Sequence, residues 1–156
     1  MREIKNTLIW LKEVNQIYFL FISLIATYLV SIPSIFMDGN EVLNYNVDIT
    51  FKFFSLLVFF GPLLETFVFQ FLIYEFLKFL NIRNKIVVVI ISSVLFSITH
   101  VINNIGDLNH YFSNGIIFMT VYLISIDRKE NSPFLNTFII HFLRNLIAVL
   151  GRIFFY

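Results

Sequence analysis

The chain has 156 residues, of which 58% are hydrophobic and 13% are charged, and its formal net charge is +1. Soluble domains are typically about 45–50% apolar and about 25% charged, so this composition indicates a membrane protein, and the length fits a single membrane domain over residues 1–156. The small net charge gives no reason to expect a nucleic-acid partner. Cysteine is absent, which excludes disulfides, a thiol nucleophile and Cys-ligated zinc.

Five apolar segments are candidates for membrane-spanning helices, each of which needs about 20 mostly apolar residues. The predicted spans are 17–37, 50–79, 85–105, 109–126 and 132–154. The first exceeds the apolar region of a signal peptide, about 7–15 residues, and no cleavage site ends it, so we expect an uncleaved span. Trp10 and Tyr18 fit interface anchors. We therefore expect an all-α, polytopic membrane helix bundle of about five transmembrane helices.

The distribution of charge between these segments predicts the orientation. Positive residues lie before the first span and in the second and fourth connections: Arg2, Lys5, Lys12, Lys78, Arg83, Lys85, Arg128 and Lys129. The remaining connections carry Asp38, Glu41, Asp48, Asp107 and His110, and we expect His110 to be solvated. Positive loops face the cytoplasm. The sequence thus predicts a multi-pass protein of the cell membrane with a cytoplasmic N-terminus and an outside C-terminus.

Few ionisable residues lie away from the ends of the predicted spans. They are Glu65, His100, His141 and Arg144. A charge at the bilayer centre costs about 2.5–3.5 kcal/mol even on insertion scales, so such groups normally face the bundle interior and serve a function. With a rise of 1.5 Å per residue, Glu65, both histidines and Asn145 lie at similar depths, roughly 14–22 Å from the cytoplasmic side. We expect them to meet.

A carboxylate and an imidazole at one depth can activate water, and further imidazole or carboxamide groups can stabilise an oxyanion on a carbonyl. That chemistry suits peptide hydrolysis. Glu65, His100 and His141 could instead hold a zinc ion with one open position, or the polar groups could simply bond helices together. The sequence contains no H-E-x-x-H, G-x-G-D or G-x-S-x-G motif.

Three short motifs carry a resemblance to a known family: GPLLETFVFQ (61–70), FSITH (96–100) and HFLRN (141–145). The chain resembles the CPBP family of CAAX proteases and bacteriocin-processing or immunity enzymes, also called the Abi family. That family shows E-E-x-x-x-R, F-x-x-x-H and H-x-x-x-N on separate membrane helices. The resemblance covers residues 50–150, which would form a CAAX-protease-like core.

The resemblance implies an intramembrane endopeptidase. Glu65 and His100 would activate the water, and His141 and Asn145 would stabilise the oxyanion. Asn145 suits an oxyanion hole better than a zinc site, so we favour a mechanism with no cofactor over one with zinc. The implied substrate is a membrane-associated peptide or protein, such as a bacteriocin, a signalling peptide or a lipidated tail. The oligomeric state is left open.

Two departures from the family pattern concern supporting residues. Thr66 replaces the second Glu and Gln70 replaces the Arg. We expect Thr66 and Gln70, four residues apart, to share a hydrogen bond that keeps the architecture. Phe96 shares a helix face with His100, and Arg144 is an extra cation that could hold Glu65 ionised.

These departures keep two other functions open. The chain could be a catalytically inactive family member that acts as a membrane interaction or bacteriocin-immunity protein. It could also be a small transporter that uses Glu65 as a proton relay.

Overall fold

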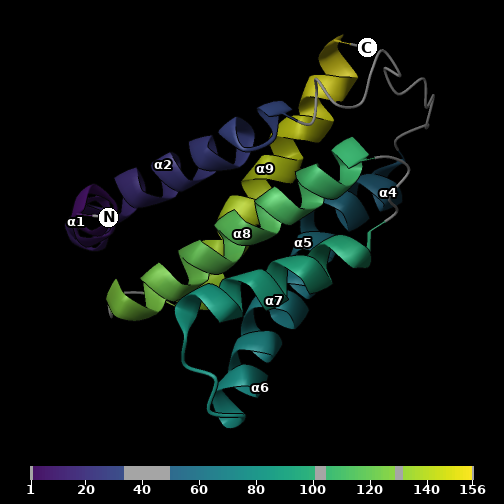
Figure 1. Ribbon diagram of the computed structural model, residues 1–156. Coiled ribbons are helices and arrows are strands. Elements are labelled where there is room, and N and C mark those ends of the chain that lie inside the picture. The colour runs from purple at the N-terminus through teal and green to yellow at the C-terminus, as the bar shows by residue number, and fades with distance from the viewer. Residues whose placement is uncertain (1, 34–49, 101–104, 129–131, 156) are drawn as a thin grey trace.

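The computed structural model describes residues 2–33, 50–100, 105–128 and 132–155, and these are almost entirely helical (Figure 1). The elements are α1 (Arg2–Glu13), α2 (Gln16–Leu29), α4 (Phe51–Ser55), η1 (Leu56–Phe60), α5 (Gly61–Glu65), η2 (Thr66–Leu72), α6 (Ile73–Phe79), α7 (Lys85–Ile98), α8 (Ile105–Arg128) and α9 (Pro133–Phe155). No strand occurs within these ranges. The all-α prediction is therefore confirmed for them.

The elements from α4 to α6 form one continuous helix, Phe51–Phe79. Two stretches of it, η1 and η2, are π-helical, with hydrogen bonds that span five residues instead of four. The first stretch ends where the Gly61 amide bonds to the Leu56 carbonyl and the next residue, Pro62, has no amide hydrogen to offer. Glu65 thus follows a stretch of altered register and precedes another.

The turn after α6 makes α6 and α7 neighbours. Asn81 takes a positive φ of 60°, which Asn tolerates better than most residues, and the Ile82 amide bonds back to the Leu77 carbonyl. Asn84 then caps α7 by accepting a hydrogen bond from the Ile86 amide at 3.0 Å. These two caps allow the chain to reverse within a few residues.

Small residues bring α7 and α8 close together. A Cβ added to Gly115 would lie 2.9 Å from Cα of Ser93, so only glycine fits this approach. Ser92 on the same helix is fully buried and donates to the Phe69 carbonyl at 2.7 Å, which joins α7 to η2. Contacts of this kind are typical of membrane helices, whose backbones approach through small side chains.

An apolar core lies among α2, α7, α8 and α9. Its buried members are Phe19, Phe96, Phe118, Val121, Ile124 and Ile140. In Figure 1, α8 and α9 cross near the middle of the bundle, and α5 lies beside them. The core therefore joins the last turn of α7 to α8 and α9, and its members Phe96 and Phe118 contact His100 and His141.

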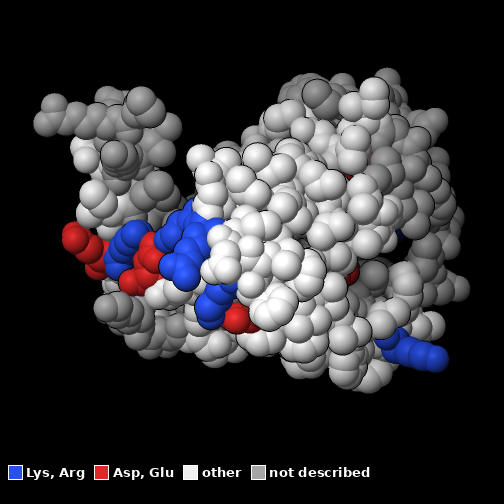
Figure 2. Space-filling model, turned by 60° about the horizontal axis from the view of Figure 1, so that its bottom comes forward, with Lys and Arg blue, Asp and Glu red and all other residues white. Residues whose placement is uncertain are grey.

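A cluster of charged side chains lies at one end of the bundle, where α1 meets α7 and α8 (Figure 2). Asp127 binds Lys12 at 2.6 Å and Lys85 at 2.7 Å. Arg128 donates to the carbonyls of Leu11 and Val14 at 2.6 and 2.7 Å, which are at the end of α1. These contacts fasten α1 to the rest of the bundle.

The predicted spans agree with the helices in place but not in every boundary. Within the described residues, Phe51–Phe79 and Pro133–Phe154 are long and apolar enough to cross a membrane, and only 22% of the most apolar part of each is buried. The helices α2 and α7 have 14 residues each, about 21 Å, against a hydrocarbon thickness of about 30 Å. The ends predicted at 34–37 and 101–104 lie outside the described residues.

The third predicted span, 85–105, is too long at its end, because α7 stops at Ile98. Thr99 Oγ1 and His100 Nδ1 both donate to the Phe96 carbonyl, at 2.9 and 2.7 Å, and so compete with continued helical hydrogen bonds. The fourth helix, α8, begins at Ile105 rather than 109.

Candidate active site

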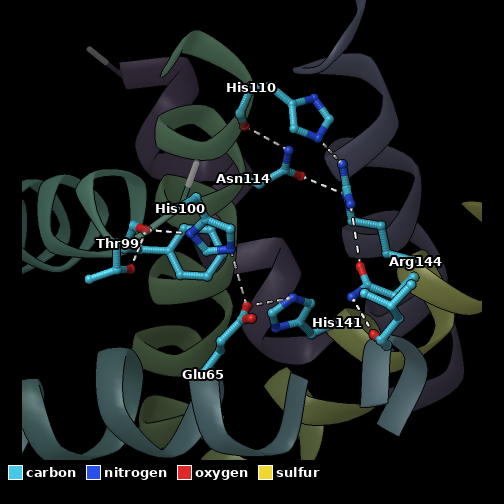
Figure 3. A network of polar contacts seen from close by, with 10 residues as sticks. Glu65, Thr99, His100, His110, Asn114, His141 and Arg144 are labelled. Atoms are coloured by element: carbon cyan, nitrogen blue, oxygen red, sulfur yellow. Dashed lines mark hydrogen bonds and ion pairs between the residues drawn. The ribbon is translucent and has the colours of Figure 1, made fainter. Parts of the chain in front are cut away.

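Glu65, the last residue of α5, faces two imidazoles (Figure 3). Its Oε2 lies 3.6 Å from Nε2 of His100, just after α7, and 3.4 Å from Nε2 of His141 in α9. Three segments that are far apart in sequence thus bring one carboxylate and two imidazoles to one point. The structure therefore confirms the prediction that Glu65, His100 and His141 lie together.

The end of α7 fixes the orientation of His100. Its Nδ1 donates to the Phe96 carbonyl at 2.7 Å, one of the carbonyls left without a helical partner at the end of the helix. The ring lies between Phe96 and Tyr111, with ring centroids 4.5 and 4.2 Å away. Because Nδ1 is the donor, Nε2 of a neutral His100 is an acceptor aimed at Glu65.

His141 is held by packing. Its side chain is buried and stacks on Phe118 with ring centroids 4.2 Å apart. Nδ1 has no hydrogen-bond partner among the described residues, so Nε2, facing Glu65, is the nitrogen placed for polar contact. Separations of 3.4 and 3.6 Å are long for direct hydrogen bonds, so the carboxylate and the two imidazoles face one another without a tight ion pair.

Asn145, predicted to bind an oxyanion, lies on the same wall but contacts the backbone. Its amide Nδ2 donates to the Leu57 carbonyl at 3.0 Å. In the five-residue pattern of η1, that carbonyl would accept from residue 62, which is a proline without an amide hydrogen. Asn145 supplies the missing donor, which ties α9 to the long helix about two turns before Glu65.

The expected hydrogen bond between Thr66 and Gln70 is wrong. Both side chains are fully buried, but Thr66 Oγ1 and both polar atoms of Gln70 have no hydrogen-bond partner among the described residues. The expectation assumed an α-helix, whereas residues 66–72 form the π-helix η2, whose backbone bonds to the fifth residue and which changes the relative positions of the two side chains.

A second group of contacts surrounds Arg144 (Figure 3). Its Nε donates to Asn114 Oδ1 at 3.0 Å, Nη2 to His110 Nε2 at 2.6 Å, and Nη1 to Asn145 Oδ1 at 3.4 Å. Arg144 forms no ion pair with Glu65. The guanidinium therefore does not bind the carboxylate directly, although both line the same cavity.

His110 and Asn114 were not predicted for the site, and the expectation of a solvated His110 is wrong. Because α8 begins at Ile105, His110 lies in its second turn and faces α9 rather than an outer loop. The spacing of His110 and Asn114, four residues apart within a helix, was the signal in the sequence that could have identified them.

The two groups of polar residues share one cavity of about 440 Å³. It is lined by Leu56, Leu57, Gly61, Glu65, Phe96, His100, His110, Tyr111, Asn114, Phe118, His141, Arg144 and Asn145. Its volume falls in the range of small-molecule sites, about 300–1,000 Å³. The cavity is thus large enough for the end of a peptide.

A zinc ion was the alternative use of Glu65, His100 and His141. Within the described residues, no group of three or more His, Cys, Asp or Glu side chains is arranged to hold a metal ion. The mechanism proposed below uses the side chains alone, and a zinc chelator tests the alternative.

Comparison with known proteins identifies the family. No curated protein and no solved structure shows a match to the chain. A family model described as type II CAAX prenyl endopeptidase Rce1-like matches residues 48–147, which is most of the chain and includes Glu65, both imidazoles and Asn145. With its two long apolar helices, this indicates a membrane protein. The chain belongs to the Rce1-like family of type II CAAX prenyl endopeptidases, which are intramembrane proteases of the CAAX type.

Proposed function

We propose that this protein is an intramembrane endopeptidase in which Glu65 and His100 activate water to hydrolyse a peptide bond of a membrane-associated peptide or protein. The observation that carries the proposal is the approach of one carboxylate oxygen to two imidazoles, at 3.4 and 3.6 Å, on the wall of a cavity that also holds other polar groups. Bacteriocin maturation or self-immunity is one role that such an enzyme could fill.

The proposed reaction begins with a water in the cavity that both Glu65 and His100 contact. Glu65 accepts a proton from this water while the oxygen attacks the peptide carbonyl. His141 donates from Nε2 to the oxyanion that forms, and Asn145 joins it when its amide leaves the Leu57 carbonyl. The proton held by Glu65 then passes to the leaving amine, which breaks the peptide bond and regenerates the carboxylate.

The proposed topology has five spans with a cytoplasmic N-terminus. It is supported by the clustering of Lys12, Lys85 and Arg128 at the end of the bundle where α1 docks. Glu65 would then lie within the bilayer, and the cavity would receive a peptide from the membrane. No cofactor and no nucleic-acid partner is part of the proposal.

A second candidate function is binding without cleavage, as a membrane interaction or immunity protein. It is favoured by Thr66 and Gln70, whose buried polar atoms have no partner among the described residues. A polar pair that is buried and unsatisfied has no evident use in the proposed reaction.

The test compares membrane-derived peptides, by mass spectrometry, from cells that express wild type or Glu65→Gln at matched levels. The matched control is Glu75→Gln, the same change in an exposed residue that pairs with Lys78 at 3.2 Å. We expect peptides that end at one recurrent site in wild type and in Glu75→Gln but not in Glu65→Gln. Adding a zinc chelator to wild-type membranes should leave these peptides unchanged.

Identical peptide sets in all three strains, with every variant folded in the membrane, would reject hydrolysis and favour the binding function. Loss of the peptides on chelation would instead show that a metal takes part.

A further inference from the structure

A second cavity, of about 330 Å³, lies along α7 and α8 at the end of the bundle where α1 docks. Its lining residues differ from those of the cavity that holds Glu65. Most of its wall is apolar, with Ile86 and Ile90 on α7 and Leu123 and Ile124 on α8. A ligand of this cavity would therefore be mostly apolar.

The cavity is a groove that runs from the charged end of the bundle toward its middle. On α8 its lining extends from Asp127 back to Ile116, which is about 16 Å along the helix axis. That length is close to half the hydrocarbon thickness of a bilayer, about 30 Å. Next to Ile90 and Ile116, α7 and α8 touch through Ser93 and Gly115, where an added Cβ would lie 2.9 Å from Cα of Ser93. The groove thus has the length of one lipid leaflet and ends beside a close contact of the two helices.

Two ammonium groups lie at the outer end of this groove. Lys12 and Lys85 both bind Asp127, at 2.6 and 2.7 Å, and their side chains are 40% and 57% exposed. Two cations and one carboxylate line the groove and leave one positive charge in excess. An ammonium has three N–H donors, and the bonds to Asp127 use at most two on either lysine. Both lysines can therefore still donate to an anion.

The side chains around these cations fit the surface of a membrane. Ile9 and Trp10 on α1 are 53% and 51% exposed, and Figure 2 shows uncharged surface beside the charged cluster. Lysines at such a place extend their ammonium groups to the membrane–water interface. In the proposed topology this end faces the cytoplasm, where the leaflet carries anionic lipids and where basic pockets between helices bind their headgroups.

We propose that the groove along α7 and α8 binds an anionic phospholipid, with one acyl chain along the apolar wall and the phosphate at Lys12 and Lys85. A headgroup with a net negative charge matches the excess positive charge, whereas a zwitterionic headgroup does not. The bound lipid would contact α1, α7 and α8 together and so strengthen the docking of α1. The site is independent of the proposed protease activity, because it is built from other residues.

The test titrates lipids into the purified full-length protein in detergent and counts the bound molecules by native mass spectrometry. The probes are phosphatidylglycerol, which is anionic, and phosphatidylcholine with the same acyl chains, which is zwitterionic. One positive charge at a membrane surface corresponds to about a fivefold change in affinity, so we expect phosphatidylglycerol to bind about fivefold more tightly. Lys12→Gln combined with Lys85→Gln should remove this preference. Lys78→Gln, which alters a lysine in an exposed ion pair outside the groove, should keep it.

A second variant leaves the charged cluster unchanged and alters the groove itself. Ile90 is 47% exposed, and Ile90→Trp places a larger side chain where the acyl chain would lie. At the lipid concentration that half-saturates wild type, we expect this variant to lose most of its bound phosphatidylglycerol. Val87→Trp is the matched control, because Val87 is a 37% exposed residue of the same helix that does not line the groove, and it should bind as wild type.

Three results would overturn the proposal: equal affinity of wild type for the two lipids, a preference that survives the double lysine substitution, or unchanged binding by Ile90→Trp. A protein dimer that binds neither lipid would also overturn it, because a second copy of the chain would then cover the groove.

Discussion

The buried polar side chains of this bundle differ in whether their hydrogen bonds are made. Thr137 is fully buried in α9, and its hydroxyl donates to the Pro133 carbonyl at 2.9 Å. Thr66 is equally buried in η2, but its hydroxyl has no partner among the described residues. An unsatisfied buried polar group costs about 1–3 kcal/mol, so the two threonines should affect stability in opposite directions.

This difference predicts the outcome of two isosteric substitutions. Thr66→Val removes a buried hydroxyl that bonds to nothing described, and we expect it to raise the midpoint of thermal unfolding in detergent. Thr137→Val, the matched control, breaks a hydrogen bond and should lower the midpoint, by a free energy of about 0.5–1.5 kcal/mol. A loss of stability in Thr66→Val as large as in Thr137→Val would show that Thr66 has a partner, such as a buried water.

For single residues, the sequence predicts the contacts that depend on how deep each residue lies in its helix. It does not predict the contacts that depend on the local hydrogen-bond register of a helix. A constant rise per residue placed Glu65, His100 and His141 at one depth, and the structure has them together. That Thr66 and Gln70 do not bond to each other could not be predicted, because π-helical stretches leave no clear mark in the sequence. In the regular helix α6, by contrast, Glu75 and Lys78 form the ion pair, at 3.2 Å, that their i,i+3 spacing indicates.

Among the helices, the most specific junction joins α9 to the long helix. Asn145 donates to a carbonyl that lacks a helical donor because residue 62 is proline. Pro62→Ala restores an amide hydrogen at that position. We therefore expect Asn145→Ala to cost about 0.5–1.5 kcal/mol in wild type and less in the Pro62→Ala background.

Chemical denaturation of the four proteins in this cycle measures the coupling. Equal costs of Asn145→Ala in both backgrounds would show that the proline does not create the need for Asn145.

The contact between α7 and α8 gives a second prediction at the level of helices. Gly115→Ala places a Cβ 2.9 Å from Cα of Ser93, and both atoms are tied to backbone, so the helices must separate. We expect a loss of about 1–3 kcal/mol in the free energy of unfolding. Gly151→Ala is the matched control, because nothing lies within 4 Å of the added Cβ, and it should be neutral or stabilising by up to about 1 kcal/mol. Similar stabilities of the two variants would contradict the close approach.

For the molecule as a whole, the attachment of α1 depends on a charged cluster at one end. Burial raises the pKa of Asp127, but hydrogen bonds from Lys12 and Lys85 outweigh this effect and hold its pKa below the usual range. A carboxyl with a lowered pKa stabilises the folded state fully above its ordinary pKa, about 3.9, and loses that contribution as the pH falls through the lowered value.

Acidification below pH 4 should therefore weaken the docking of α1. The single tryptophan, Trp10, lies on α1, so its fluorescence emission reports the change. We expect the emission of wild type to shift between pH 5 and the acid limit, and Asp127→Asn to show the shifted emission already at neutral pH. Glu75→Gln, which alters an ion pair elsewhere, should behave as wild type. Identical pH profiles of wild type and Asp127→Asn would exclude this role of Asp127.

The positions of the helices followed from apolar runs, whereas their lengths depended on caps and contacts. The run at 85–105 is mostly apolar, yet α7 ends at Ile98, because Thr99 and His100 bond to the carbonyl of Phe96. Hydropathy cannot reveal this, because the helix end depends on these two side-chain hydrogen bonds and not on the apolarity of the run. The docking of Arg128 on α1 is likewise a contact between distant segments that no local pattern indicates.

In the proposed reaction, Glu65 and His100 act together on one water. The most direct measurement is the rate of cleavage at the recurrent site in wild type, Glu65→Gln, His100→Gln and the double variant. General acid–base groups contribute about 10²–10⁴-fold, so each single variant should lose at least about a hundredfold, and the double variant should be no slower than the slower single one. Wild-type cleavage by Glu65→Gln, or losses that multiply in the double variant, would contradict a shared role.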